Sequence, residues 1–155
     1  MFGIFSKGEP VSMEGELVQP SSIVINDYEE ELHLPLSYWD IKDYKNSWLK
    51  SLGEGLSNKT HSALAVSMYE PEKTNFIFTW VLYFEDEKVY VQNNVIFLEE
   101  CHGFSPENIN KFIESRTTHD GDGMKISEWH TDLNSVLDFY HSLNNASLEH
   151  HHHHH

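Results

Sequence analysis

The stretch "NFIFTWVLYFEDEKVYVQNNVIFL", residues 75–98, decides the fold. Residues 75–84 place apolar side chains on both faces of an extended chain, with Phe76, Phe78, Trp80, Leu82 and Phe84 on one face and Ile77, Thr79, Val81 and Tyr83 on the other. Two mostly apolar faces are typical of a strand covered on both sides. The charged residues 85–88 then turn the chain into a second strand at residues 89–98. Because so short a link cannot carry a parallel crossover, the two strands are predicted to pair antiparallel.

Two further segments extend this hairpin into a sheet. Residues 62–68 ("SALAVSM") also alternate and predict a preceding strand, so that three consecutive strands form a meander. Residues 124–129 ("MKISEW") predict a fourth, short strand.

A helix is predicted before the sheet. Apolar residues there recur at intervals of three and four, which places them on one stripe of a helix: Ile41, Tyr44, Trp48, Leu49, Leu52 and Leu56. Ser37 or Asp40 is expected to cap this helix, and Asn58 to end it.

Two more helices are predicted in the C-terminal half. One begins with Ser105 as the N-cap and Pro106 in the first turn, and its face is formed by Ile109, Phe112, Ile113 and Arg116. Thr131 is expected to cap the last helix, whose apolar residues are Leu133, Val136, Leu137, Tyr140 and Leu143. The predicted fold is therefore α+β: a single domain in which an antiparallel meander packs against about three helices.

The ends of the chain are expected to differ from this domain, which is predicted to span residues 34–147. Residues 1–33, rich in glycine and proline at the start, predict a loose N-terminal arm with a possible short strand at residues 21–27. Residues 148–155, Leu-Glu and six histidines, have the composition of an expression tag and are not expected to belong to the domain.

The composition is strongly acidic. The chain has 10 Lys+Arg against 25 Asp+Glu, and without Glu149 of the tag the net charge is about −14 with neutral histidines. Nucleic acids and anionic membranes are recognised by Lys and Arg, so the balance argues against both as partners. It favours a basic protein partner, or an acidic surface that serves solubility alone.

Cys101 is the single cysteine, which rules out an intrachain disulfide and is typical of a reducing compartment. No apolar run approaches the ~20 residues of a membrane span, and the N-terminus lacks the features of a secretory signal. The expected location is the cytoplasm.

The segment "HDGDGMKISEWH", residues 119–130, was tested as a metal site. Two aspartates alternate with glycines as in a calcium loop, but from Asp120 the fifth, sixth and twelfth positions are Met124, Lys125 and Thr131, which do not fit. A turn explains the same residues, because glycines supply positive φ and aspartates bind local amides. A site that combines His102, Asp120, Asp122 and His130, with His119 as a further candidate, lacks the short fixed ligand spacing of zinc sites.

Signals for catalysis are absent. Cys101 follows Glu99 and Glu100, whose charge raises a thiol pKa. Glu128 could be a buried carboxylate with a raised pKa, but an ion pair with Arg116 or an outward position on a strand explains it better. No catalytic residues, metal or cofactor are predicted.

Three acidic clusters remain as candidate partner-binding residues, at the ends of predicted elements: Glu29, Glu30 and Glu31; Glu85, Asp86 and Glu87; Glu99 and Glu100. Each alone is typical of a solvated edge. Together they can form a field that attracts a basic protein.

From about Leu34 to Leu143 the chain resembles the immunity proteins of bacterial contact-dependent growth inhibition. The resemblance is carried by "YWDIKDYKNSWLKSL" (38–52), by "VYVQNNVIFL" (89–98) and above all by "DGDGMKISEW" (120–129), in which an aspartate–glycine turn precedes Ile126, Ser127, Glu128 and Trp129.

This resemblance implies a cytoplasmic antidote that binds and blocks the C-terminal toxin domain delivered by a neighbouring cell, commonly a nuclease. It implies no catalytic residues, and it allows the Ile126–Trp129 motif to be a signature of the fold. Two alternatives stay open: a small metal-dependent hydrolase, and a regulatory interaction module unrelated to toxins. The oligomeric state is also open.

Overall fold

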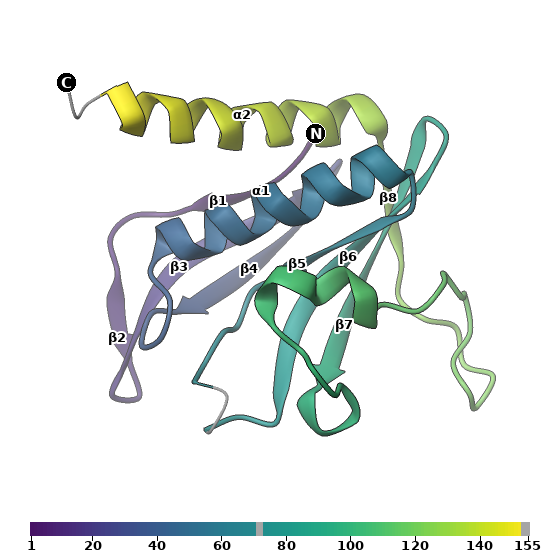
Figure 1. Ribbon diagram of the computed structural model, residues 1–155, viewed down its shortest axis with the longest axis horizontal. Helices are drawn as coiled ribbons and strands as arrows, with labels where there is room; N and C mark the ends of the chain where they lie inside the picture. Colours follow the sequence, from purple (N-terminus) through teal and green to yellow (C-terminus); the bar gives the residue numbers. More distant parts are fainter. Residues whose placement is uncertain (71–72, 153–155) are drawn as a thin grey trace.

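The computed structural model describes residues 1–70 and 73–152 and confirms a single α+β domain built from antiparallel sheets (Figure 1). The first four strands form an N-terminal sheet: β1 (Phe2–Ser6), β2 (Val11–Met13), β3 (Glu16–Ile25) and β4 (Tyr28–Pro35). The next four form a meander sheet: β5 (His61–Ala65), β6 (Phe76–Glu85), β7 (Lys88–Phe97) and β8 (Trp129–Asp132). The helices are α1 (Ile41–Asn58) and α2 (Leu133–His152), with two 3₁₀ turns, η1 (Leu98–Glu100) and η2 (Pro106–Phe112).

The N-terminal sheet corrects the prediction of a loose arm. The long strand β3 is its centre, with β1 and β2 paired along one side and β4 along the other. Gly8 and Gly15, at φ +72° and +81°, turn the chain between these short strands. Pro20 is tolerated in β3 because it stands opposite the gap between β1 and β2, where its carbonyl accepts from the Lys7 N–H at 2.8 Å. Of the strand predicted at residues 21–27, residues 21–25 are thus the last part of the longer β3, and residues 26 and 27 form the turn into β4.

The meander sheet confirms the central prediction. Strands β5, β6, β7 and β8 pair antiparallel in chain order. A two-residue turn at Asp86 and Glu87 joins β6 to β7, and Asp86 takes φ +57°. Strand β5 ends at Ala65, three residues before the predicted end.

The fourth strand was predicted in the wrong place. Strand β8 begins at Trp129 and pairs only with residues 88–91 of β7. The residues before it form an irregular loop in which an isolated bridge joins His119 to Lys125. Residues 124–128 alternate in sequence but have no neighbouring strand to pair with.

Helix α1 lies where its periodicity predicts. Asp40 caps it: its side chain accepts from the Asp43 N–H at 2.9 Å, and the Asp43 carboxylate accepts from the Asp40 N–H at 3.1 Å. The helix ends at Asn58. Gly55 lets its last turn touch β5, because a Cβ there would collide with His61 O and Ser62 Oγ.

The other two helices differ from prediction. The helix expected after Ser105 is the 3₁₀ segment η2, which is interrupted by non-helical backbone at Asn108. Helix α2 is capped one residue later than predicted: Asp132 accepts from the Ser135 N–H, while Thr131 belongs to β8 and donates to Asn26. Among the described residues, neither α1 nor α2 is both long and apolar enough to cross a membrane.

Candidate functional site

An aromatic stack joins the two sheets. Tyr28 of β4 stacks on Trp129 of β8 with ring centroids 4.6 Å apart and an interplanar angle of 27°. Trp129 in turn packs against Trp80 of β6, with centroids 5.4 Å apart. The tryptophan of the Ile-Ser-Glu-Trp motif therefore links the N-terminal sheet to the meander sheet.

The glutamate of the same motif anchors the loop before β8. Both Glu128 carboxylate oxygens accept from Arg116, at 2.8 Å from Nε and 2.6 Å from Nη2. The Arg116 guanidinium lies 3.8 Å from the centre of the Tyr90 ring, and Gln92 also donates to Glu128. The Arg116 hydrogen bonds lower the pKa of Glu128. This confirms the predicted ion pair and gives Glu128 a structural role.

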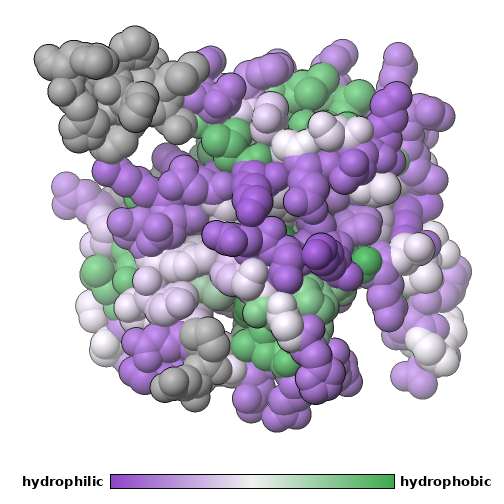
Figure 2. Space-filling model, in the orientation of Figure 1, coloured by the Kyte–Doolittle hydropathy of each residue, from purple (hydrophilic) through white to green (hydrophobic). Residues whose placement is uncertain are grey.

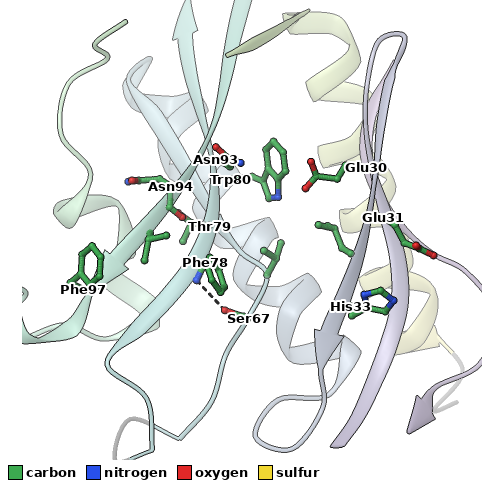
Figure 3. Close-up of a pocket in the computed structure, with 13 residues that line it drawn as sticks. Glu30, Glu31, His33, Ser67, Phe78, Thr79, Trp80, Asn93, Asn94 and Phe97 are labelled. Carbon is green, nitrogen blue, oxygen red and sulfur yellow. Dashed lines mark hydrogen bonds between the residues drawn. The ribbon is translucent and has the colours of Figure 1, made fainter. Parts of the chain in front are cut away.

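Next to the stack, a groove of about 680 Å³ lies between β4 and the β6–β7 hairpin (Figure 3). Glu30 and Trp80 extend toward each other from the two walls, whereas Glu31 points to the far side of β4 (Figure 3). Phe78 lies deeper in the view, where its backbone N–H donates to the hydroxyl of Ser67 at 3.0 Å.

The groove opens onto an exposed aromatic surface at the end of the hairpin. Phe76, Phe78 and Phe97 are 41%, 48% and 53% exposed. Phe76 lies opposite Phe97 in the strand register, and its ring centroid is 5.2 Å from that of Phe78. The prediction that β6 is covered on both faces is therefore wrong at this end. It holds from Thr79 to Phe84, which are buried.

The charge in the groove is negative. Glu30 accepts from the Tyr28 hydroxyl at 2.5 Å, and this bond, together with burial, raises the pKa of Tyr28 to about 12. Tyr28 therefore remains the proton donor at physiological pH. Among the described residues, the groove has no lysine or arginine in its lining.

The acidic clusters do not form one surface. Glu29, Glu30 and Glu31 lie inside β4 rather than at its end, and Glu29 pairs with Lys7 at 2.7 Å. Glu85, Asp86 and Glu87 form the β6–β7 turn, and Glu85 lies 3.4 Å from Arg116. Glu99 and Glu100 follow the opposite end of β7, about 30 Å away at 3.3 Å per strand residue.

The turn before β4 lies beside the part of the meander sheet that carries the acidic β6–β7 turn. Asn26, in the turn before β4, donates to the His130 carbonyl and accepts from Thr131, both at 2.9 Å. His130 and Thr131 pair with the part of β7 that follows the acidic turn. In Figure 1 the β6–β7 turn is at the upper right and the chain after β7 is at the bottom.

The segment tested as a metal site forms a turn. The Asp120 carboxylate accepts from the N–H groups of Asp122 and Met124, at 2.9 and 3.0 Å, and Gly123 takes φ +83°. Among the side chains that the structure describes, no three of His, Cys, Asp or Glu come together as a metal site. Burial, and secondly Glu100, raises the pKa of Cys101, in the direction predicted.

Sequence reasoning missed the groove. It placed Phe78 and Trp80 on a face that was expected to be covered, because alternation alone does not show what packs on a strand. One signal was present: Asn93 and Asn94 interrupt the apolar residues of β7, and Asn93 lies opposite Trp80. A polar pair in a central strand indicates a solvated patch.

Polar side chains cover most of the face seen in Figure 2. Hydrophobic patches interrupt this polar surface along the upper helices and below the centre.

Comparison with known families identifies the chain. A family model described as the CdiI N-terminal domain matches residues 34–139, more than half of the sequence and nearly the whole region of the resemblance. The match covers α1, the complete meander sheet and the Ile126–Trp129 motif. The chain therefore belongs to the CdiI family of contact-dependent growth inhibition immunity proteins.

Proposed function

We propose that this protein binds and neutralises the C-terminal toxin domain of a contact-dependent growth inhibition effector, in the cytoplasm of the cell that makes the immunity protein. The observation that carries the proposal is the family match over residues 34–139. The partner is a basic domain, a nuclease, and inhibition is by binding rather than by catalysis.

The charge of the chain supports a basic partner. A nuclease needs a positive cleft to hold phosphates. An inhibitor with a net charge of about −14 is attracted to such a cleft at rates raised roughly 10- to 10³-fold. The same charge disfavours binding of nucleic acid by the immunity protein itself.

The acidic residues of β4 and of the β6–β7 turn are the ones that we assign to this attraction. Glu30 and Glu31 lie in β4 and Asp86 and Glu87 form the turn, whereas Glu29 and Glu85 already have cationic neighbours. Glu99 and Glu100 lie at the opposite end of β7, and we expect them to contribute less.

Co-expression tests the function directly. The chain without its histidine tag is produced together with the C-terminal domain of the toxin encoded immediately upstream. We expect the two proteins to purify as a pair and growth to be rescued. Full toxicity in the presence of folded immunity protein would contradict the proposal, as would turnover of nucleic acid by the immunity protein alone.

Charge reversal tests the role of the acidic turn. Changing Asp86 and Glu87 to lysine should slow association with the toxin domain about tenfold and flatten its dependence on salt, because steering acts through the field at the approaching surface. The matched control changes Glu99 and Glu100 to lysine. The association rate is measured by stopped-flow. If the two pairs of substitutions change this rate equally, the turn does not contribute specifically to the binding surface.

A further inference from the structure

We infer that the groove between β4 and the β6–β7 hairpin binds an extended segment of the toxin domain in which an apolar side chain stands beside a lysine or arginine. This inference rests on the proposed function and specifies where and how the partner is held. It draws on three features of the groove: the exposed phenylalanines, an unpartnered indole N–H, and a carboxylate without a cation.

The phenylalanines supply the apolar contact. Phe78 and Phe97 are about half exposed, although apolar residues nearer the turn of the same hairpin, such as Leu82 and Val89, are completely buried. Exposed aromatic side chains that cluster beside a concave surface are typical of binding sites, and aromatic residues provide much of the energy at protein interfaces. An apolar side chain of the partner would cover these rings.

The indole N–H of Trp80 supplies a directional contact. Trp80 is only 2% exposed, yet its indole nitrogen has no acceptor among the described residues. No fully buried side-chain nitrogen or oxygen of those residues is left without a partner, so this nitrogen is not fully buried. Figure 3 shows it directed into the space between the walls. A backbone carbonyl of an extended segment is a suitable acceptor.

Glu30 supplies the charge. It extends toward Trp80 (Figure 3) and accepts one hydrogen bond, from Tyr28 to Oε1. A carboxylate accepts more than one bond, so Oε2 remains available. Because the described lining holds no lysine or arginine, the cation that completes Glu30 has to come from the occupant. This favours a basic partner over an acidic or neutral one.

The two walls have different origins. The wall with Trp80 and Phe78 belongs to the segment matched by the family model, residues 34–139, whereas the wall with Glu30 precedes it. A partner segment in the groove would touch both. The choice among toxins of different sequence would then depend on the β4 wall.

Four single variants test the inference against the toxin domain encoded immediately upstream. Phe78→Ser and Glu30→Gln should each raise the dissociation constant for the toxin domain about tenfold or more. The loss of affinity caused by Glu30→Gln should be smaller in high salt. The matched controls are Leu17→Ser, which removes a side chain that is 50% exposed on β3, and Asp138→Asn on α2. The controls should change the dissociation constant less than twofold. Phe97→Ser replaces Phe78→Ser if the latter unfolds.

The indole resonance of Trp80 gives a readout of the hydrogen bond itself. In ¹H–¹⁵N spectra of the wild-type protein, addition of the toxin domain should shift this resonance downfield and slow its exchange with solvent. The resonance of Trp48, whose indole N–H already donates to the Ala65 carbonyl at 2.8 Å, should not move.

The outcomes separate this inference from the proposed function. If wild-type protein binds the toxin domain while the groove variants bind equally well and the Trp80 resonance stays in place, the groove is not the site but the function stands. If the wild-type protein does not bind at all, both fall. If Phe78→Ser instead abolishes self-association of the free protein, the groove joins two copies of this chain and the inference is wrong.

Discussion

The two ends of the β6–β7 hairpin have similar sequences and different surroundings. Near the turn, Leu82, Val89 and Val91 are completely buried, because β8 pairs with this part of β7 and the N-terminus of α2 lies beside it. At the other end no strand of the described residues pairs with residues 92–97 of β7 on the side of β8, and Phe76 and Phe78 are exposed. Apolar alternation therefore predicts a strand, but whether other elements pack against that strand depends on distant parts of the chain. We assign the packed core of the covered end to stability and the groove at the bare end to close contact with the partner, whereas the exposed acidic turn at the covered end attracts the partner.

The largest expected effect contrasts the two ends on one face of β6. Leu82→Ala should lower the free energy of unfolding by about 2–5 kcal/mol, because it leaves a cavity in the packed end. Phe78→Ala should cost about 1 kcal/mol, because the ring is half exposed already. Urea unfolding at pH 7 measures both. Similar losses would show that the groove end is as important for stability as the core.

The next prediction compares two asparagines. Asn110 closes the free edge of β5: its Oδ1 accepts from the Ala63 N–H at 2.8 Å and from the Ser51 hydroxyl at 3.0 Å. Asn110→Ala should cost about 2 kcal/mol, since it leaves a buried N–H without a partner. Asn93→Ala, in the groove, should change stability by less than about 0.5 kcal/mol. Thermal unfolding of the two variants measures both losses of stability. A large loss of stability for Asn93→Ala would contradict the assignment of the groove end to binding.

A smaller effect concerns the pH dependence of the loop that holds β8. Arg116 lowers the pKa of Glu128 in the folded state, so the unfolded state binds more protons there as the pH falls. The stabilisation is complete above the ordinary glutamate pKa of 4.5 and is lost as the pH falls through the lowered value. Glu128→Gln should cost about 1.5 kcal/mol at pH 7.

The difference in the free energy of unfolding between the wild type and Glu128→Gln should shrink as the pH falls below 4.5. Urea titrations at several pH values measure it. The matched control is Glu107→Gln, an exposed residue of η2, which should leave the profile unchanged. A difference that grows in acid would contradict the assigned sign.

The sequence predicted elements whose signal is local. The spacing of Tyr44, Trp48 and Leu52 defines α1, and the short link at residues 85–88 forces antiparallel pairing. The N-terminal sheet escaped prediction because β1 and β2 have only five and three residues, too few to show alternation. Their pairing with β3 is what makes them strands.

The candidate site was predicted less well than the fold. The acidic residues were found, but the face of β4 that each one takes became visible only in the structure: Glu30 points into the groove and Glu31 away from it. Trp80 and Glu30 are fifty residues apart in the chain, and their approach depends on the stack of Tyr28, Trp129 and Trp80. No periodicity encodes a contact of that kind.

Amide hydrogen exchange, measured with and without the toxin domain encoded upstream, tests the division between the two ends of the hairpin most directly. We predict slower exchange on binding at the backbone N–H groups of Glu31 and His33 in β4 and of Asn93 and Val95 in β7, with no change in the turn at residues 120–123. Protection confined to that turn or to α2, with the groove still exchanging freely, would contradict the account.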